Sequence, residues 1–483
     1  MASADFMALL PLLVTAVSSL IVLLLAAFHR AHGLAAGVTS SGLAVALMTL
    51  PVAFQVAPRQ VTTLLMVDAY AIFYIGLMLA ASLAIAGLSY GYLEKRGGRQ
   101  EEFYVLLLLA TLGAITLAAA THLASFFLGL ELLSLSLYVL IAYVRTDRQP
   151  LEAGLKYLIL SGTSSAFLLF GMALLYFQSG AMGFAAMASD LGRQAELSVQ
   201  FLVGLVLILT GVGFKLAVVP FHMWAPDVYQ GAPAPVAAFV ATASKGAMFA
   251  LLLRYFTEIA AFRSAALWWT LAGIAALSMF VGNLLALLQD NVKRMLAYSS
   301  IAHLGYLLVA LLAGGPLAVE AVTVYLAAYF ITTIGAFGVV AVLSGPGGEA
   351  DSMEDYRSLF RRRPWIAAVF TIMLLSLAGI PLTAGFLGKF YVIAAGVDAS
   401  LWLLLILLVA NSVIGLFYYL RVIVAMFTET GLGDDRVWKA PAMSASYLDG
   451  FVLAALSGLL FWLGLYPEPL IGFVRTMERG LTG

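Results

Sequence analysis

Long apolar runs separated by short polar stretches make up most of this chain. A helix needs about 20 apolar residues to cross the hydrocarbon core of a bilayer, and fourteen runs of roughly that length occur among the 483 residues. We therefore predict an all-α polytopic membrane protein with about fourteen transmembrane helices. They are placed near residues 6–28, 33–56, 69–91, 103–121, 123–144, 152–178, 199–222, 235–260, 266–288, 295–314, 316–344, 364–393, 400–428 and 447–472.

Two of these runs combine an internal proline with an internal lysine. The seventh contains LTGVGFKLAVVPFHMW and the twelfth LSLAGIPLTAGFLGKFYV, and each combines glycine, proline and one lysine. A proline breaks a helix, and such a break persists in lipid only where protein or water covers it. The two runs lie five helices apart and so cross in opposite directions. This pattern predicts two inverted five-helix repeats, each containing a Pro-broken helix, around a hydrated interior.

The repeats divide the chain into four predicted parts. A three-helix region comes first, and a single helix follows the second repeat. The parts are the N-terminal region 1–100, the first repeat 101–262, the second repeat 263–430 and the C-terminal helix 431–483.

Composition supports the membrane assignment. Hydrophobic residues make up 63% of the chain and charged residues only 10%, with a mean hydropathy of +1.02; soluble proteins carry about a quarter charged residues. The 25 basic and 25 acidic residues balance, so net charge does not suggest a nucleic-acid partner. The absence of cysteine excludes disulfides, thiol chemistry and cysteine-bound iron–sulfur clusters.

The basic residues are distributed unevenly over the predicted loops. Fourteen lysines and arginines follow odd-numbered helices, and five lie in the other loops and at the termini. Cytoplasmic loops carry the excess of positive charge, so we predict that both termini face the opposite side. Six cations remain inside the predicted spans: Lys156, Lys215, Lys245, Arg254, Lys389 and Arg421.

Glu131 is the carboxylate nearest the middle of any predicted span. Ionisable groups within a membrane are costly, and a functional role is their default interpretation. Lys215 is its predicted partner, because an adjacent ammonium group keeps a buried carboxylate charged. Two alternatives remain: a static ion pair, or a glutamate satisfied by Ser134 at helical spacing i+3.

The other intramembrane lysines are predicted proton relays. Lys245 lies about ten residues into its helix, and Lys389 follows the break at Pro381 by two turns. The alternative for both is snorkelling towards an interface. Lys156 follows Glu152 at i+4, so a structural intrahelical pair is the alternative there.

Histidine titrates near neutral pH, so His222 and His303 are candidates to bridge lysines that stand too far apart for direct transfer. A structural hydrogen-bonding role is equally compatible with both. Asp227 is expected to be a turn residue rather than a site of proton uptake. Arg254 and Arg421 are expected to contact lipid headgroups or partner subunits.

Lysines, one glutamate and two broken helices in a helical bundle are what a proton path across a bilayer requires. The sequence has no nucleotide, haem or flavin motif. The driving energy is therefore expected to come from an ion gradient or from a partner.

Several segments together resemble the antiporter-like membrane subunits of bacterial proton-translocating NADH:quinone oxidoreductase (respiratory complex I) and of Mrp-type cation/proton antiporters. The resemblance extends over almost the whole chain. Its segments are HLASFFLGLELLSL, LEAGLKYLILSGTSS, GFKLAVVPFHMWAPDVYQGAPAPV, ATASK, NVKRMLAYSSIAHLGYLLVAL and SLAGIPLTAGFLGKFYV.

By matching positions, the resemblance implies roles for individual residues. Glu131 and Lys215 would be the coupling pair, Lys245 the central relay and Lys389 the terminal residue of the second half. Lys156 and His303 would occupy further polar positions on the central axis.

The resemblance also implies a function. It is that of a proton-translocating membrane subunit, which couples NADH-to-quinone electron transfer in other subunits to proton movement along the lysine/glutamate axis. The chain would be an enzyme only as part of an H⁺-translocating NADH:quinone reductase, with no redox chemistry of its own. It would carry no cofactor, whereas NADH, flavin, iron–sulfur clusters and quinone would bind partner subunits.

The implied partners are the other membrane and peripheral subunits of complex I, including neighbouring antiporter-like subunits, together with lipids. The implied location is the bacterial cell inner membrane, with both termini periplasmic. Two alternatives remain open: an Mrp-type Na⁺(K⁺)/proton antiporter subunit, and a membrane scaffold whose ion pairs are structural.

Overall fold

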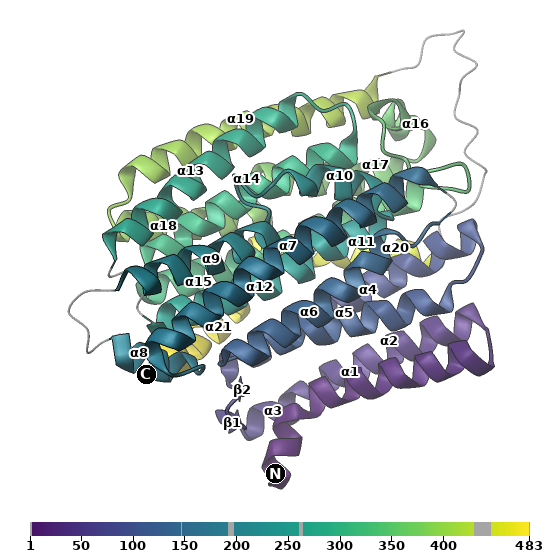
Figure 1. Ribbon diagram of the computed structural model, residues 1–483. Helices are drawn as coiled ribbons and strands as arrows, with labels where there is room; N and C mark the ends of the chain where they lie inside the picture. The colour runs from purple at the N-terminus through teal and green to yellow at the C-terminus, as the bar shows by residue number, and fades with distance from the viewer. Residues whose placement is uncertain (1, 146, 192–197, 260–263, 429–445, 483) are drawn as a thin grey trace.

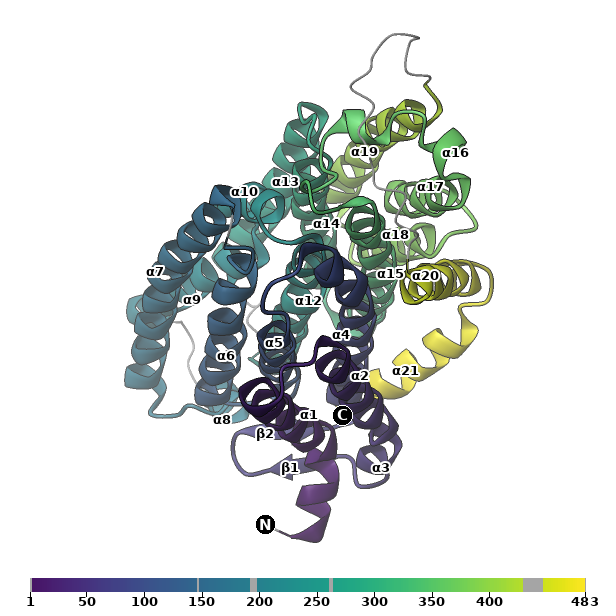
Figure 2. The same ribbon diagram turned by 90° about the vertical axis from the view of Figure 1, so that its right-hand side faces the viewer.

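The computed structural model describes residues 2–145, 147–191, 198–259, 264–428 and 446–482. Within these ranges, thirteen helices are long and apolar enough to cross a membrane, and α17 (Pro364–Ala378) is a shorter apolar helix. The long helices lie side by side in one bundle, and both chain termini lie at the same end of it (Figures 1 and 2). The predicted all-α membrane architecture is confirmed.

The N-terminal part forms one edge of the bundle. Helices α1 (Ser3–Phe28) and α2 (His32–Met48) lie outermost, and α3 (Leu50–Gln55) continues α2 after a one-residue interruption. A small antiparallel hairpin, β1 (Arg59–Val61) with β2 (Leu65–Val67), precedes α4 (Ala69–Arg96) and was not predicted.

The remaining elements follow in chain order. In the region of the first repeat they are α5 (Glu101–Ala119), α6 (Leu123–Ile141), α7 (Arg148–Ser179), α8 (Phe184–Leu191), α9 (Val199–Leu216), α10 (Trp224–Gly231), α11 (Ala234–Phe239), the π-helical turn η1 (Val240–Ser244) and α12 (Lys245–Ile259). In the second they are α13 (Ala265–Leu287), α14 (Val292–Ala313), α15 (Gly315–Leu343), the 3₁₀ turn η3 (Met353–Tyr356), α16 (Leu359–Arg362), α17, α18 (Ala384–Asp398) and α19 (Trp402–Phe427).

Both predicted proline breaks are present. The chain leaves helical geometry between α9 and α10, across Pro220, and between α17 and α18, across Pro381. Gly379 ends α17 with a left-handed φ of 84°, which glycine adopts without steric cost. Each break therefore separates two half-helices inside the bundle.

Three spans form the interior of the bundle. In the most apolar window of α11–α12 and of α14 every residue is buried, and in α15 94% are. Polar side chains on these helices are therefore enclosed by protein, which is where buried ionisable groups of a membrane protein are found.

The C-terminal region corrects one prediction. Residues 447–472 were expected to form one helix, but α20 (Tyr447–Leu465) ends before a second helix, α21 (Glu468–Thr482). Its buried residues Ile471, Val474 and Met477 recur every three positions, which defines a single apolar stripe. This stripe packs across α15 and α4.

Arg254 was expected at lipid headgroups or a partner, and this is wrong. Its side chain is 2% exposed and makes two hydrogen bonds of 2.8 Å to the Asp68 carboxylate, over the ring of Tyr70. Arg421 also bonds within the chain, since it donates to the backbone carbonyls of Leu287 and Gln289 at the C-terminal end of α13.

Asp68→Asn is expected to destabilise the protein strongly. Removing one partner of a buried ion pair leaves an uncompensated charge, at a cost of about 3–5 kcal/mol in the free energy of unfolding. The matched control is Asp5→Asn, which breaks the partly exposed pair with Arg59 and should cost about 1 kcal/mol or less. Thermal unfolding of the purified protein in detergent measures both, and equal shifts would contradict the prediction.

Candidate functional site

Three lysines lie inside the bundle without a carboxylate partner. Lys215, Lys245 and Lys389 are 2%, 1% and 8% exposed. Ion pairs among the described lysines are made instead by Lys156 and Lys293. Snorkelling is excluded as an account of Lys245 and Lys389, since neither side chain reaches the surface.

Lys215, in the last turn of α9, contacts α6 and α7. Its ammonium group donates to Ser134 Oγ at 3.0 Å and to the Tyr157 hydroxyl at 2.8 Å. The same nitrogen lies 5.4 Å from the centre of the Tyr157 ring, within the range of a cation–π contact.

Lys245 begins α12, directly after the π-helical turn η1. Such turns within helices occur frequently at functional sites. Its Nζ donates to Ser300 Oγ of α14 at 2.8 Å and lies 5.4 Å from the centre of the Tyr229 ring. Ser300 also accepts a hydrogen bond from the Tyr329 hydroxyl of α15 at 2.8 Å.

Lys389, on α18, uses the second helix break. It donates to the carbonyl of Ala378, the last residue of α17, at 2.8 Å and to Ser412 Oγ of α19 at 2.7 Å. Its Nζ lies 5.5 Å from the centre of the Tyr306 ring. The Ala378 carbonyl is available because the break removes its intrahelical donor.

All three lysines thus share one environment: a serine hydroxyl acceptor and a tyrosine ring. A hydroxyl accepts a hydrogen bond from an ammonium group and can rotate to donate to a neutral amine. A tyrosine ring stabilises the cation without fixing it as a carboxylate would. These contacts are compatible with both protonation states of the lysine.

His303, on α14, stands between Lys245 and Lys389. Its Nδ1 lies 2.7 Å from the Tyr325 hydroxyl and its Nε2 lies 3.2 Å from the Tyr419 hydroxyl. Its ring is 5.4 Å from that of Tyr329 and 5.5 Å from that of Tyr306. It therefore contacts Tyr329, which bonds to the same serine as Lys245, and Tyr306, whose ring adjoins Lys389.

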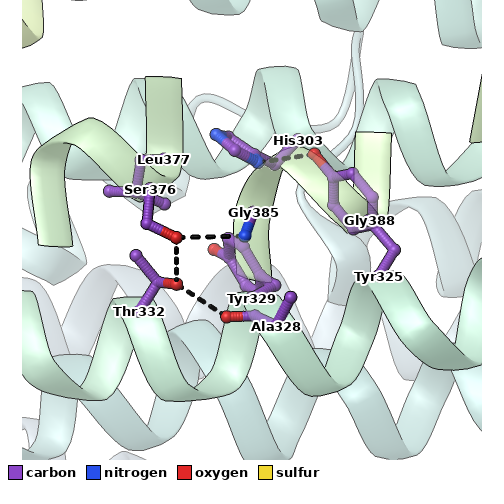
Figure 3. Close-up of a pocket in the computed structure, with 9 residues that line it drawn as sticks. All are labelled: His303, Tyr325, Ala328, Tyr329, Thr332, Ser376, Leu377, Gly385 and Gly388. Carbon is purple, nitrogen blue, oxygen red and sulfur yellow. Dashed lines mark hydrogen bonds between the residues drawn. The ribbon is translucent and has the colours of Figure 1, made fainter. Parts of the chain in front are cut away.

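A small cavity adjoins His303 at the second helix break (Figure 3). Its volume is about 10 Å³, close to the smallest that holds one water molecule. On its floor, Ser376 Oγ lies 3.1 Å from Thr332 Oγ1 and accepts from the Gly385 backbone N–H at 3.1 Å. Polar groups of α14, α15, α17 and α18 thus meet at one point.

Glu131, on α6, lies one helical turn from Ser134, the residue that binds Lys215. Its Oε1 accepts a hydrogen bond of 2.6 Å from Ser165 of α7, whereas Ser134 donates to the Leu130 carbonyl. The proposed satisfaction of Glu131 by Ser134 is therefore wrong. Among the described residues Glu131 and Lys215 do not form a direct ion pair, although both contact α7.

Lys156 occupies a different setting, at a recess of about 150 Å³. Its side chain is 43% exposed and forms ion pairs of 2.8 Å with Glu152 and with Asp227. Asp227 also pairs with Arg294 at 2.7 Å. Asp227 lies in helix α10, so its assignment to a turn is wrong.

His222 is buried in the break that precedes α10. Among the described residues, no hydrogen bond connects it to Lys215 or Lys245. None connects the contacts of Lys215 with those of Lys245 either. The structure therefore connects Lys245 to His303 through Ser300 and Tyr329, and His303 to Lys389 through Tyr306. Lys215 and Glu131 form a separate group.

The serine and tyrosine partners were missed from the sequence. Ser300, Ser412, Tyr229 and Tyr306 belong to other helices than the lysines they contact, and these helices hold many other small and aromatic residues. Tyr157, which contacts Lys215, is distinguished in the sequence only by following the candidate residue Lys156 directly.

Comparison with known proteins gives consistent results. Residues 120–415 match the family described as NADH:quinone oxidoreductase/Mrp antiporter, TM. NADH-quinone oxidoreductase subunit N of Ectopseudomonas mendocina (strain ymp) is 52% identical over 476 residues, which are 97% of this chain and 95% of the relative. The resemblance of the sequence to the antiporter-like membrane subunits of this enzyme is confirmed.

Solved structures agree. A chain of respiratory complex I from Thermus thermophilus with bound aureothin is 34% identical, with a TM-score of 0.82, over 96% of this chain and 98% of its own. A chain of an archaeal membrane-bound sulfane sulfur reductase is 25% identical, with a TM-score of 0.85, over 98% and 97%. A chain of the Mrp complex from Dietzia sp. DQ12-45-1b, 21% identical over 100% and 98% with a TM-score of 0.87, shares the fold.

Identity of this extent over nearly the full length of both chains shows common family membership. The chain therefore belongs to the family of NADH-quinone oxidoreductase subunit N, within the wider family of membrane subunits shared by NADH:quinone oxidoreductases and Mrp antiporters.

Proposed function

We propose that this chain is a proton-translocating membrane subunit of an NADH:quinone oxidoreductase, with Glu131, Lys215, Lys245 and Lys389 as its proton-relay groups. One observation carries the proposal: three lysines are buried without ion pairs, each between a serine hydroxyl and a tyrosine ring. A structural lysine at such depth needs a fixed counter-ion to offset its desolvation. Groups that gain and lose a proton need contacts that tolerate both states.

Protons reach the axis from water at the recess of Lys156 and Asp227, whose charged side chains remain partly exposed. A change of charge on Glu131 alters how strongly the ammonium form of Lys215 is stabilised, since both groups contact α7. Proton transfer from Lys215 to Lys245 requires bridging water, and His222, in the nearby break, is a secondary relay group. From Lys245, the path follows Ser300, Tyr329 and His303 to Lys389.

The energy for these steps comes from electron transfer in partner subunits. NADH, flavin, iron–sulfur clusters and quinone are proposed to bind there, and this chain to contribute no redox group. The partners are the other membrane and peripheral subunits of the complex, including neighbouring antiporter-like subunits, and lipids. The location is the bacterial inner membrane, with both termini periplasmic, as the distribution of basic residues favours.

Lys245→Gln and Lys389→Gln are expected to lower the number of protons pumped per NADH oxidised in membrane vesicles containing the complex. Glutamine keeps the hydrogen bond to serine but cannot carry a proton. Lys95→Gln is the matched control, because Lys95 is a half-buried lysine that binds the Val342 carbonyl away from the axis. Wild-type stoichiometry in assembled Lys245 and Lys389 variants would remove both residues from the path.

Exchange of Na⁺ or K⁺ for protons by this chain alone is the rival function. The likeness to the Mrp chain is one of fold, and no further observation favours cation exchange. Reconstitution of the purified chain in liposomes decides between them. Gradient-driven cation exchange would contradict the proposal, whereas co-purification with an NADH-oxidising assembly supports it.

A further inference from the structure

A buried carboxylate that the relay leaves out lies near the start of α15, the helix that also carries Tyr325 and Tyr329. Glu320 is on α15, five residues after its first residue, and its side chain is 5% exposed. The relay above does not use it. A buried carboxylate in a membrane span is a candidate functional group by default.

Glu320 is adjacent to the helix that carries Lys389. A Cβ on Gly388 would lie 3.1 Å from the Tyr325 Cα, so α18 and α15 pack at very short range there. Glu320 is five residues from Tyr325, about 7.5 Å along the helix axis. Tyr391, two residues after Lys389, hydrogen-bonds with Glu320, which places the carboxylate on the terminal side of the lysine.

Arg475 of the amphipathic helix α21 connects Glu320 to water. Its guanidinium lies 3.5 Å from Glu320 Oε1, and its side chain is 57% exposed. The charged groups that act on the neighbouring Tyr391 are Glu320, Arg475 and Glu468. One end of this ion pair is therefore enclosed by protein and the other is in solvent, as a group that passes protons to bulk water requires.

We propose that Glu320 is the proton-release group of this subunit, with Tyr391 and Arg475 as its positioning residues. The inference rests on the proposed function. The ammonium form of Lys389 gives its proton through intervening water to the Glu320 carboxylate, which becomes a carboxylic acid. That acid then releases the proton to water beside α21, and Arg475 pairs again with the carboxylate, since a guanidinium favours its ionised form.

The first test uses the assembled complex in membrane vesicles. Glu320→Gln should lower the protons pumped per NADH to the level of Lys389→Gln, and the double variant should fall no further, because both residues act on one path. Asp398→Asn is the matched control, since this exposed carboxylate is the last residue of α18. Native-gel quantification verifies assembly.

The second test separates proton release from mere anchoring of α21. In Arg475→Gln, acidification of the release compartment should inhibit pumping at a pH about one unit higher than in the wild type. Without the guanidinium, the Glu320 carboxylate retains its proton more readily. Arg475→Lys should restore the wild-type pH profile. An anchoring role alone would change thermal stability and leave the pH profile unmoved.

The outcomes distinguish the two levels of the proposal. Wild-type stoichiometry in Glu320→Gln, with a reduced value in Lys389→Gln, overturns Glu320 as the release group and leaves the proposed function standing. Wild-type stoichiometry in both variants overturns the proposed function itself. If Glu320→Gln fails to assemble, the pH profile of Arg475→Gln, at an exposed position, decides.

Discussion

Lys215→Ala and Glu131→Ala are each expected to slow proton pumping and quinone-linked NADH oxidation by about tenfold or more while the complex still assembles. Alanine can neither donate nor accept a proton, so each variant removes an ionisable group from the proposed relay. An increase of only about 1.4 kcal/mol in the barrier slows a step tenfold. Both rates are measured in membrane vesicles and normalised to the amount of assembled complex.

The matched control for the glutamate is Glu354→Ala. Glu354 is in the turn η3, its side chain is 65% exposed, and it pairs with Arg357. Its replacement should leave both rates close to the wild-type values, because an exposed ion pair outside the relay contributes little. Normal pumping in fully assembled Lys215 or Glu131 variants would remove this pair from the mechanism and favour a structural role.

Gly385→Ala is expected to have a large effect on assembly. Gly385 is the second residue of α18 and lies directly against the last turn of α17, where an added Cβ would overlap the Ser376 carbonyl oxygen. A backbone carbonyl cannot move aside as the end of a flexible side chain can, so α17 and α18 must move apart. We expect a loss of about 3 kcal/mol or more in stability, seen as a lower melting temperature and less assembled complex.

The same substitution should disturb the relay, because Gly385 lines the cavity beside His303 (Figure 3). Gly162→Ala is the matched control: it is a helical glycine with no atom within 4 Å of an added Cβ, and alanine there should be neutral or slightly stabilising. Equal melting temperatures for the two variants would show that the break at α17–α18 is not tightly packed.

The broken helices could be predicted because their cause is local. Pro220 and Pro381 interrupt apolar runs at their own positions, and the structure breaks both helices there. The candidate residues were found for a similar reason, since a charge inside a membrane-length apolar run is visible without knowledge of its partners. Helix α21 was missed because its apolar stripe follows α20 after only a short gap.

The sequence could not predict contacts between side chains on different helices. Arg254 was placed at the surface, but its counter-ion Asp68 is 186 residues away along the chain, and nothing local indicates that pairing. Helical spacing made Ser134 an alternative partner for Glu131, whereas in the structure Ser134 accepts a hydrogen bond from Lys215 of α9.

The sequence by itself determined the number of spans, the two helix breaks and the candidate intramembrane lysines, because hydropathy, proline and charge act through the residue that carries them. Only the tertiary structure decided what each residue touches. It brought α12 against α14 and α18 against α19, so that Lys245 meets Ser300 and Lys389 meets Ser412, and it set Lys156 apart in a partly exposed ion-pair cluster. Such contacts depend on helix packing between distant segments, and the chemistry of a proton path depends on them.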